Sequence, residues 1–490
     1  MKVAEAPAGI GYEAVIGIEV HVQLKTDSKM FCGCSTDFQD ASPNSHTCPI
    51  CLGMPGTLPV ANRLAVEHVL ATGLALDAEI PAVTRWDRKN YFYPDLPKGY
   101  QISQYDLPLT ARGRLTFETS RGAVTVGITR AHLEEDTARL LHTTDDSGRP
   151  ISLIDFNRSG VPLMEIVTEP ELHSAEEARR YAEELRLLLL TIGASDAALE
   201  NGQMRVEANV SLRPVGQAAF GTRVEVKNMN SFRSVERAIG FEIERQARTL
   251  DAGGQLVQET RGWDDDGGLT YTMRVKETSD DYRYFPEPDL PPLHADAGWL
   301  ESIRKRLGEL PAARRERYRA ELGLSAYDAA VLVGDLRATA LFEEARSADP
   351  TLPAKRLANW VTGEYLRLAK QVAADSRVRG AELARLVRLV SDGTLSGTNA
   401  KQVFERHFRT GQPVDQIVAE LGLAQISDQS ALAAAVDEAI RANPRAVEDI
   451  RRGKPQAIGA LVGHVMKATR GQANAGLVQQ LIRERLDSGG

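Results

Sequence analysis

The sequence predicts an α+β protein in which a mainly antiparallel sheet comes first and two all-α regions follow. Apolar and polar residues alternate with a period of two in four segments, which is typical of strands that bury one face: 14–24, 124–135, 203–213 and 222–228. These segments do not alternate regularly with helices, and this favours an antiparallel sheet over a doubly wound parallel one. After residue 295 the strand pattern disappears and helical spacing replaces it.

End signals predict two helices among the strands and one early in the C-terminal part. The first begins after Ser174, because Ser174 and Glu177 have the spacing of a capping box. The second covers 232–250 and should end before the glycine pair at 253–254. Farther along, Ser325 is a plausible helix cap.

We expect three domains. An α+β domain over 1–293 ends in the proline-rich stretch 284–293, which is typical of a domain boundary. A helical linker domain over 294–406 and a helical tail domain over 407–490 follow. In the tail, a helix with apolar residues at helical spacing is predicted to end at Gly471.

The composition is that of a soluble globular protein, with 490 residues, 42% hydrophobic and 26% charged. There is no apolar run of 18 residues and no hydrophobic core of a signal peptide, so we expect a cytoplasmic protein without a membrane partner. The formal net charge of −8 argues against a general polyanion binder, although a local basic patch could still bind RNA.

The four cysteines predict a zinc site. They have the spacing C-x-C-x13-C-x2-C and are Cys32, Cys34, Cys48 and Cys51. Two close pairs can each bind one side of a tetrahedral Zn²⁺ ion, and four thiolates leave no open position, so the zinc would be structural. Two disulfides or free buried thiols are the alternatives.

Several predicted strands carry acids, amides and cations on one face. Glu19 and His21 lie on the face opposite the aliphatic residues of the first strand. The other polar positions of this kind are Glu134, Glu135, Arg205, Glu207, Asn209, Arg223, Glu225 and Lys227. Carboxylates suit Mg²⁺ and cationic side chains suit phosphate, so a Mg-ATP phosphotransfer site is plausible, without a P-loop. A sheet face that meets only water would also alternate in this way.

Two further stretches could contact nucleic acid or shape the site. Residues 85–106 place aromatic residues among cations, which can stack on bases, although buried aromatics that anchor a loop would look the same. The tail is basic between 445 and 470 and could follow an RNA backbone or be an ordinary solvated surface. Asn157 and Arg158 lie in a shaped turn before a short strand.

Six motifs together resemble the GatB/GatE family, the B subunits of aspartyl/glutamyl-tRNA amidotransferases. They are "IGIEVHVQL", "DRKNYFYPDLPKGYQISQ", "DFNRSGVPLMEIV", "RVEANVSLRP", "VEVKNMNSF" and "SDDYRYFPEPDLPPL". The tail resembles a YqeY-type domain. The resemblance implies a cradle domain related to glutamine synthetase and guanidino kinases. It also implies ATP-dependent activation of Glu-tRNA(Gln) or Asp-tRNA(Asn), followed by amidation with ammonia.

The resemblance also implies roles for individual residues. The Mg²⁺ site would use Glu19, His21, Glu135 and Glu225, with Glu134 and Glu207 as neighbours. We assign the nucleotide to Arg205, Arg223 and Lys227, from strand parity, and to Asn157 and Arg158. The ammonia channel would be lined by Lys89, Lys98 and Tyr91. Contacts to tRNA are expected from Arg451, Arg452, Lys454, Lys467 and Arg470.

The sequence predicts that another protein chain releases the ammonia. All four cysteines belong to the cluster, and no G-x-S-x-G elbow or amidase-type serine loop occurs. The resemblance names the partners as an amidase (GatA) and a small bracing protein (GatC), which form a heterotrimer with this chain. Misacylated tRNA is a further partner, as is a non-discriminating aminoacyl-tRNA synthetase. Two alternatives remain: a stand-alone phosphotransferase, and a zinc-containing tRNA-binding scaffold without catalysis.

Overall fold

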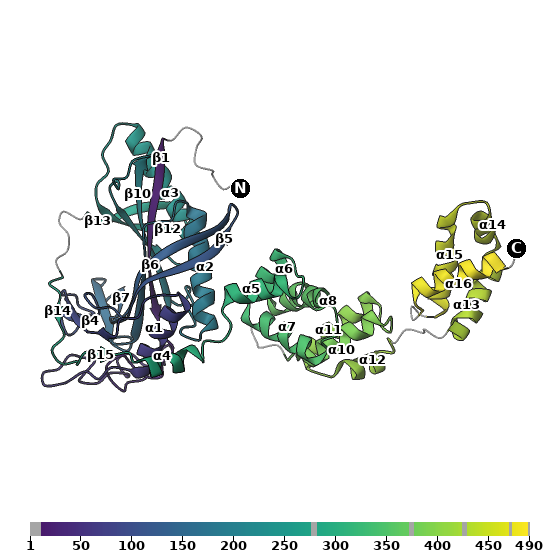
Figure 1. The fold of residues 1–490 in the computed structure, drawn as a ribbon, viewed down its shortest axis with the longest axis horizontal. Coiled ribbons are helices and arrows are strands. Elements are labelled where there is room, and N and C mark those ends of the chain that lie inside the picture. Colours follow the sequence, from purple (N-terminus) through teal and green to yellow (C-terminus); the bar gives the residue numbers. More distant parts are fainter. Residues whose placement is uncertain (1–10, 276–281, 372–376, 424–428, 470–472, 489–490) are drawn as a thin grey trace. The chain divides into compact units, whose positions relative to one another are not determined.

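The computed structural model describes residues 11–275, 282–371, 377–423, 429–469 and 473–488. It divides into two compact units, Met1–Ala312 and Ala313–Gly490. The first unit combines a large sheet with helices, and the second is helical (Figure 1). The predicted α+β class, with a mostly antiparallel sheet followed by helices, is confirmed.

An eight-stranded sheet forms the first unit, in the order β13-β12-β11-β10-β1-β9-β6-β5. The strands are β1 (Tyr12–Gln23), β5 (Thr110–Thr119), β6 (Gly122–Glu135), β9 (Pro162–Thr168), β10 (Met204–Pro214), β11 (Val224–Met229), β12 (Glu259–Asp264) and β13 (Leu269–Val275). All neighbours are antiparallel except β11 and β12, which are parallel. The central strand β1 therefore lies between β10 and β9.

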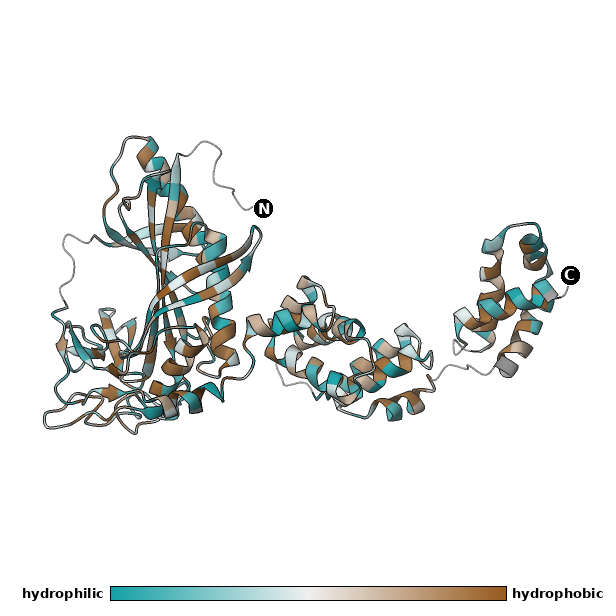
Figure 2. Cartoon of the chain, in the orientation of Figure 1, coloured by the Kyte–Doolittle hydropathy of each residue, from teal (hydrophilic) through white to brown (hydrophobic). Residues whose placement is uncertain are grey.

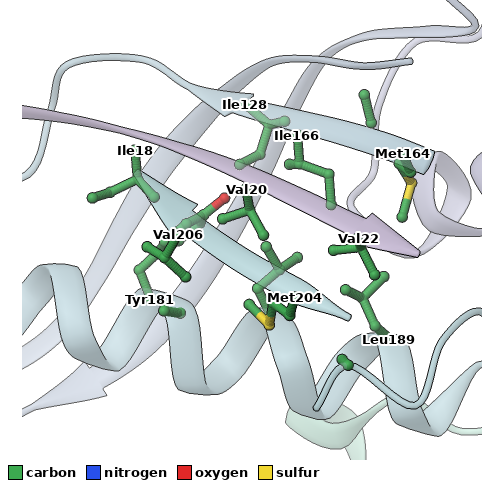
Figure 3. Packing of buried hydrophobic residues seen from close by; sticks show 14 of the residues in the cluster. Ile18, Val20, Val22, Ile128, Met164, Ile166, Tyr181, Leu189, Met204 and Val206 are labelled. Atoms are coloured by element: carbon green, nitrogen blue, oxygen red, sulfur yellow. The ribbon is translucent and has the colours of Figure 1, made fainter. Parts of the chain in front are cut away.

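One face of the sheet is covered by three helices: α1 (Arg63–Ala75), α2 (Ala175–Thr191) and α3 (Phe232–Asp251). Hydrophobic and hydrophilic residues are mixed along the strands and helices of this unit (Figure 2). The alternation along β1 explains the helical cover, because its apolar residues Ile18, Val20 and Val22 are fully buried and point towards α2 in Figure 3. Tyr181 and Leu189 of α2 pack on this layer. Each such side chain contributes about 1.5–3 kcal/mol when it leaves water. The polar residues of β1 consequently lie on the opposite face.

The predicted helix ends are also present. The Ser174 side chain accepts from the backbone N–H of Glu177 at the start of α2, and Glu177 reaches back to the N–H of His173. Ser231 caps α3 in the same way, and Gly253, with φ of +73°, closes its C-terminus. Ser325 caps α6 (Ala326–Val333) as predicted.

Short sheets and one helix complete the first unit. A three-stranded sheet contains β14 (Phe285–Pro286), β3 (Asp87–Asn90) and β4 (Tyr100–Ser103), and the two-stranded pairs are β15 (Leu293–His294) with β2 (Val83–Thr84) and β7 (Arg139–Thr144) with β8 (Pro150–Asp155). The proline-rich stretch 284–293 thus pairs inside this unit, and α4 (Ala297–Arg304) packs on α1 beyond it. The unit continues to Ala312.

Glu67 of α1 joins α4 to the rest of the unit. Its carboxylate accepts from the Trp299 indole at 2.9 Å and from Arg306 at 2.8 Å. Burial raises the pKa of Glu67, but the hydrogen bonds from Arg306, Trp299 and Arg63 outweigh burial and hold it at about 2.

We expect this contact to weaken in acid. Because the folded pKa lies below the ordinary value of about 4.3, the contribution of Glu67 to stability is complete above that pH and is lost as the pH falls towards 2. The indole ¹⁵N–H resonance of Trp299 should shift over this range. In Glu67→Gln the shift should be absent, and an unchanged titration in that variant would contradict the assignment.

The second unit is built of short helices. The first group contains α5 (Pro311–Ala320, which begins before the boundary), α6, α7 (Leu336–Ala348), α8 (Ala354–Asn359), the π-helix η1 (Trp360–Tyr365), α9 (Leu366–Ala369), α10 (Gly380–Ser391), α11 (Gly397–Thr410) and α12 (Val414–Leu421). The second contains α13 (Gln429–Ala442), α14 (Pro444–Arg451), the 3₁₀-helix η2 (Pro455–Ala457), α15 (Ile458–Ala468) and α16 (Ala475–Ser488).

The tail helices share a core of their own, which includes Leu461 and Val465 of α15, Val478 and Ile482 of α16, and residues of α13. The apolar spacing that predicted α15 is therefore the stripe that it buries. Gly471, the predicted end of that helix, lies outside the described residues. Among the described helices, none has the length and apolarity needed to cross a membrane.

Candidate metal and nucleotide site on the polar face of the sheet

Three glutamates from neighbouring strands meet on the polar face. Glu19 of β1 stands directly opposite Glu207 of β10, and Glu225 of β11 stands opposite Asn209. One carboxylate oxygen of each glutamate lies within 4.8 Å of the others. We call this group the three-glutamate site. It exists because all three residues occupy positions of the same parity on adjacent strands.

A second ligand group lies two residues farther along β1. His21 stands opposite Glu165 of β9, and its Nε2 lies 3.8 Å from that carboxylate. Together with Glu134 of β6, these residues offer ligand atoms within 4.8 Å of one another. We call this group the histidine site. Since Glu19 and His21 are two residues apart on one strand, both sites lie on the same face of the sheet.

Hydrogen bonds and cations hold the three-glutamate site together. The Asn209 amide donates to Glu19 at 2.8 Å, and the Thr260 hydroxyl donates to Glu225 at 2.7 Å. Lys227 places its ammonium 2.8 Å from Glu207 and 3.2 Å from Glu225. Burial, followed by repulsion from neighbouring glutamates, raises the pKa of Glu19. Burial alone would lower the pKa of Lys227, but attraction to Glu207 and Glu225 outweighs burial, so the pKa lies above its ordinary value.

The histidine site is more deeply buried and is balanced by positive charge. Glu134 is 2% exposed and lies 3.6 Å from the Lys89 ammonium. His132 of β6 lies 3.5 Å from Glu134 and 3.3 Å from Glu165. Burial raises the pKa of Glu165, but attraction to His132 prevails and lowers it to about 2. Both carboxyls are thus kept ionised and able to bind a cation.

Both groups fit a divalent cation. Oxygen and imidazole ligands suit Mg²⁺ or Mn²⁺. In the three-glutamate site a cation already lies among the carboxylates, because the Lys227 ammonium contacts two of them. In the histidine site His132 and Lys89 flank the carboxylates in the same way.

The structure does not bring Glu135 to either group. Neighbouring residues on a strand point to opposite faces, so Glu134 faces the histidine site and Glu135 faces away. Glu135 pairs with Lys98 and accepts from the backbone N–H of Ile102 at 3.0 Å. The expectation that Glu135 joins Glu19, His21 and Glu225 is therefore corrected: these three residues are divided between two neighbouring sites, and Glu135 belongs to neither.

Glu165, which the sequence reasoning missed, completes the histidine site with His21 and Glu134. Its sequence context "LMEIV" places it among apolar neighbours, and β9 is buried on both faces. A single acid in such a strand is costly to bury unless it is paired, and that cost is the signal that could have identified it.

Of the predicted nucleotide residues, only some lie beside the acidic sites. Lys227 reaches the three-glutamate site, and Arg205 donates to Asp136 at 3.2 Å beside it, opposite His21. Arg223 is exposed just before β11. Arg158 donates to the Thr137 and Ala138 carbonyls and lies 3.7 Å from Asp136.

Asn157, in contrast, is fully buried and turned towards the cysteine loop. It accepts from the N–H of His46 at 2.7 Å and donates to the carbonyl of Ser42 at 2.8 Å. These bonds occupy both ends of its amide, so the side chain shapes this loop and is not directed at either acidic site.

The predicted channel residues Lys89 and Lys98 contact the last two residues of β6, which face opposite sides of the strand. Lys89 contacts Glu134, while Lys98 contacts Glu135. Tyr91 packs edge-on near the Lys89 side, with its ring 6.0 Å from that of Tyr282. A cavity of about 230 Å³ is lined by Lys98 and Glu135 and also by residues of the cysteine loop.

The four cysteines converge as predicted. Their sulfurs lie within 4.8 Å of one another, all as free thiols. Lys29 is 1% exposed and places its ammonium 3.7 Å from the Cys51 sulfur and 2.7 Å from the carbonyl of His46. Four close thiols beside a buried cation fit a tetrahedral metal, because the ammonium offsets part of the thiolate charge. Zinc is the metal that this donor set favours.

The basic residues of the tail are exposed. Arg452 pairs with Glu448, and Lys454 lies 3.0 Å from Asp449. Arg451 and Lys467 are exposed too. Arg470 lies outside the described residues. The two acids that pair with them reduce the positive charge that α14 presents, so its surface is less basic than a count of arginines and lysines indicates.

Comparisons with known proteins match nearly the whole chain. A model of the GatB/GatE catalytic domain matches residues 14–301, and one of the GatB domain matches 340–486. The B subunit of the aspartyl/glutamyl-tRNA(Asn/Gln) amidotransferase from Moorella thermoacetica is 52% identical over 478 residues, which are 97% of this chain and 100% of the relative. The proteins of the same name from Caldicellulosiruptor saccharolyticus and Anaeromyxobacter sp. (strain K) are each 50% identical, over 97% of this chain and 99% of theirs.

Proposed function

Since the chain belongs to the GatB/GatE family, we propose that it is the component of a glutamine-dependent tRNA amidotransferase that activates and amidates the aminoacyl group. Its substrates are the side-chain carboxylates of Glu-tRNA(Gln), Asp-tRNA(Asn) or both. The observation that carries this proposal is the pair of neighbouring ligand groups on one face of the sheet.

The reaction takes place in two steps. A carboxylate oxygen of the aminoacyl group attacks the γ-phosphorus of ATP, the bond to ADP breaks and an acyl phosphate forms. Ammonia then attacks the acyl carbon, phosphate leaves with the bonding electrons, and a proton is lost from the nitrogen. The products are Gln-tRNA(Gln) or Asn-tRNA(Asn), ADP and phosphate.

The chain's own residues supply charge and position. Glu19, Glu207 and Glu225, with His21, Glu134 and Glu165, would hold Mg²⁺, which when bound neutralises the phosphate oxygens of ATP. Lys227 and Arg205 lie beside these groups and add fixed positive charge on the same face. Such groups stabilise charge that develops in the transition state, and this is the main task of a phosphotransfer site.

Ammonia is supplied from outside the chain. We assign its release to a separate amidase, GatA, which the small protein GatC braces against this chain. Its entry is assigned to the cavity of Lys98 and Glu135, with Lys89 and Tyr91 nearer the histidine site. The misacylated tRNA and a non-discriminating synthetase complete the set of partners. The reaction is placed in the cytoplasm, and the exposed cations of the tail would contact the tRNA backbone.

An assay of the amide donor tests this division of labour. The chain is incubated with misacylated tRNA and ATP, with and without the amidase. We expect glutamine to serve only when the amidase is present, and ammonium to serve in both mixtures. Amide formed without ATP, or from glutamine by the chain alone, would refute the proposed function.

The cysteine cluster is proposed to hold one structural zinc ion. Metal analysis of the chain, purified under reducing conditions, should find about one Zn²⁺ per molecule. Cys51→Ser removes one of four ligands, so the zinc content should fall to a small fraction. Ser45→Ala, in the same loop but outside the cluster, should leave it unchanged. A metal-free wild-type chain with disulfide-bonded cysteines would contradict this prediction.

A further inference from the structure

Lys227 contacts two of the carboxylates that a metal ion in the three-glutamate site would need. Its ammonium lies 2.8 Å from Glu207 and 3.2 Å from Glu225, two of the three carboxylates of the three-glutamate site. The ligand atoms of that site span no more than 4.8 Å. A divalent cation that contacts all three carboxylates would therefore share Glu207 and Glu225 with the ammonium, and the two positive groups would repel each other.

The charges of the site also favour an exchange. Three carboxylates and one ammonium leave a net charge of about −2, so the group attracts a further cation. Hydrogen bonds fix the carboxylates themselves, because Asn209 holds Glu19 and Thr260 holds Glu225. Of the groups in contact here, the lysine is the one that can leave most easily: its side chain is 34% exposed and has four flexible carbons.

A phosphate group offers the ammonium a new partner on the same face. Lysine binds phosphate as a compact point charge and does not need a fixed orientation. When nucleotide phosphates approach the cation, their oxygens come within reach of Lys227, which follows the ligand Glu225 by two residues on β11. The energetic cost of leaving Glu207 and Glu225 is then offset by the new contact.

We propose that Lys227 is a positioning residue that exchanges partners: it holds Glu207 and Glu225 together in the metal-free site and moves to the nucleotide phosphates when a divalent cation enters. This inference rests on the proposed function, because it takes the three-glutamate site as the site of a Mg²⁺ ion that binds ATP. Its consequence is thermodynamic. Metal and nucleotide each bind more tightly in the presence of the other. A metal ion that binds alone has to displace Lys227 from its carboxylates without a new partner for the ammonium, and a nucleotide that binds alone lacks the contact with Lys227.

The test is a Mn²⁺ titration of the full-length chain, followed by electron paramagnetic resonance, with and without a non-hydrolysable ATP analogue. The Mn²⁺ binding that is lost in Glu225→Gln is assigned to the three-glutamate site. In Lys227→Gln we expect this site to bind Mn²⁺ about tenfold more tightly without nucleotide, and the further gain from the ATP analogue to shrink by a similar factor. Circular dichroism confirms that each variant is folded.

Lys25→Gln is the matched control. Lys25 also pairs with a carboxylate at 2.8 Å, that of Asp196, but is 62% exposed and lies outside the site, so Mn²⁺ affinity should not change. If Glu225→Gln binds Mn²⁺ like the wild type, the assignment of a metal ion to the three-glutamate site fails, and this inference fails with it, whereas the amide-donor assay still tests the proposed function. If Glu225→Gln loses the sites but Lys227→Gln binds no more tightly than the wild type, the exchange is wrong and the metal assignment stands.

Discussion

Replacement of Glu19 by glutamine should lower the rate of tRNA amidation by at least about 100-fold and leave tRNA binding unchanged. Glutamine has nearly the same shape and can still meet the Asn209 amide, but it removes one of the three negative charges of the site. A metal ligand set that loses a charge loses affinity for Mg²⁺ and the stabilisation of phosphoryl transfer. Single-turnover amidation with ammonium as donor measures the first effect, and filter binding of tRNA measures the second.

Glu13→Gln is the control for this variant. Glu13 lies on the same strand and has the same parity, but it pairs with Arg213 at 3.2 Å, away from both ligand groups. Its replacement should leave the amidation rate within a factor of about two, since a surface pair contributes little. Amidation that persists in Glu19→Gln would favour the scaffold alternative, in which this chain binds tRNA without catalysis.

Replacement of Lys89 by methionine is expected to destabilise the first unit by about 3–5 kcal/mol, because it leaves the buried carboxylate of Glu134 without its ammonium partner. Lys89 is 20% exposed, lies 3.6 Å from the carboxylate of Glu134, and packs over the ring of Tyr282. Methionine keeps most of the side-chain volume, so the loss is mainly electrostatic. Urea unfolding at neutral pH in a chelating buffer measures the free energy, and added Mg²⁺ should restore part of it if the histidine site binds the ion.

Lys305→Met shows what an exposed pair contributes. Lys305 lies 3.8 Å from Glu301, almost the same separation, but is 74% exposed. Its replacement should change the free energy of unfolding by less than about 1 kcal/mol. Equal effects of the two variants would mean that the charge of Lys89 does not hold the histidine site together.

The alternation of β1 made much of the fold predictable. Its apolar face had to be covered, and its polar face had to remain accessible, so the sequence alone placed Glu19 and His21 on one face of the sheet. Sequence could not decide between Glu134 and Glu135, because the choice depends on which parity of β6 faces the same side as β1. That is set by the register of His132 opposite Glu165, which links segments far apart in the chain.

The cysteine cluster shows the same limit. The spacing of the four cysteines was sufficient to predict their convergence. Lys29 was not predicted to be buried beside them, since a lysine in "SKMF" looks like an exposed residue. It can be buried because the His46 and Phe156 carbonyls and the Cys51 sulfur satisfy its ammonium. His46 and Cys51 belong to the cysteine loop, whereas Phe156 lies in the turn between β8 and β9, more than 100 residues farther along the chain.

The position of β1 in the sheet determines what happens while the chain is being synthesised. Its two neighbours, β9 and β10, lie about 150 and 190 residues farther along the sequence. At a translation speed of about 5–20 residues per second, β1 remains without a partner strand for roughly seven to thirty seconds before β9 is synthesised, and for about ten to forty seconds before β10 is. During that interval an unpaired strand is open to aggregation, so the nascent chain is a natural client for chaperones that shield such segments.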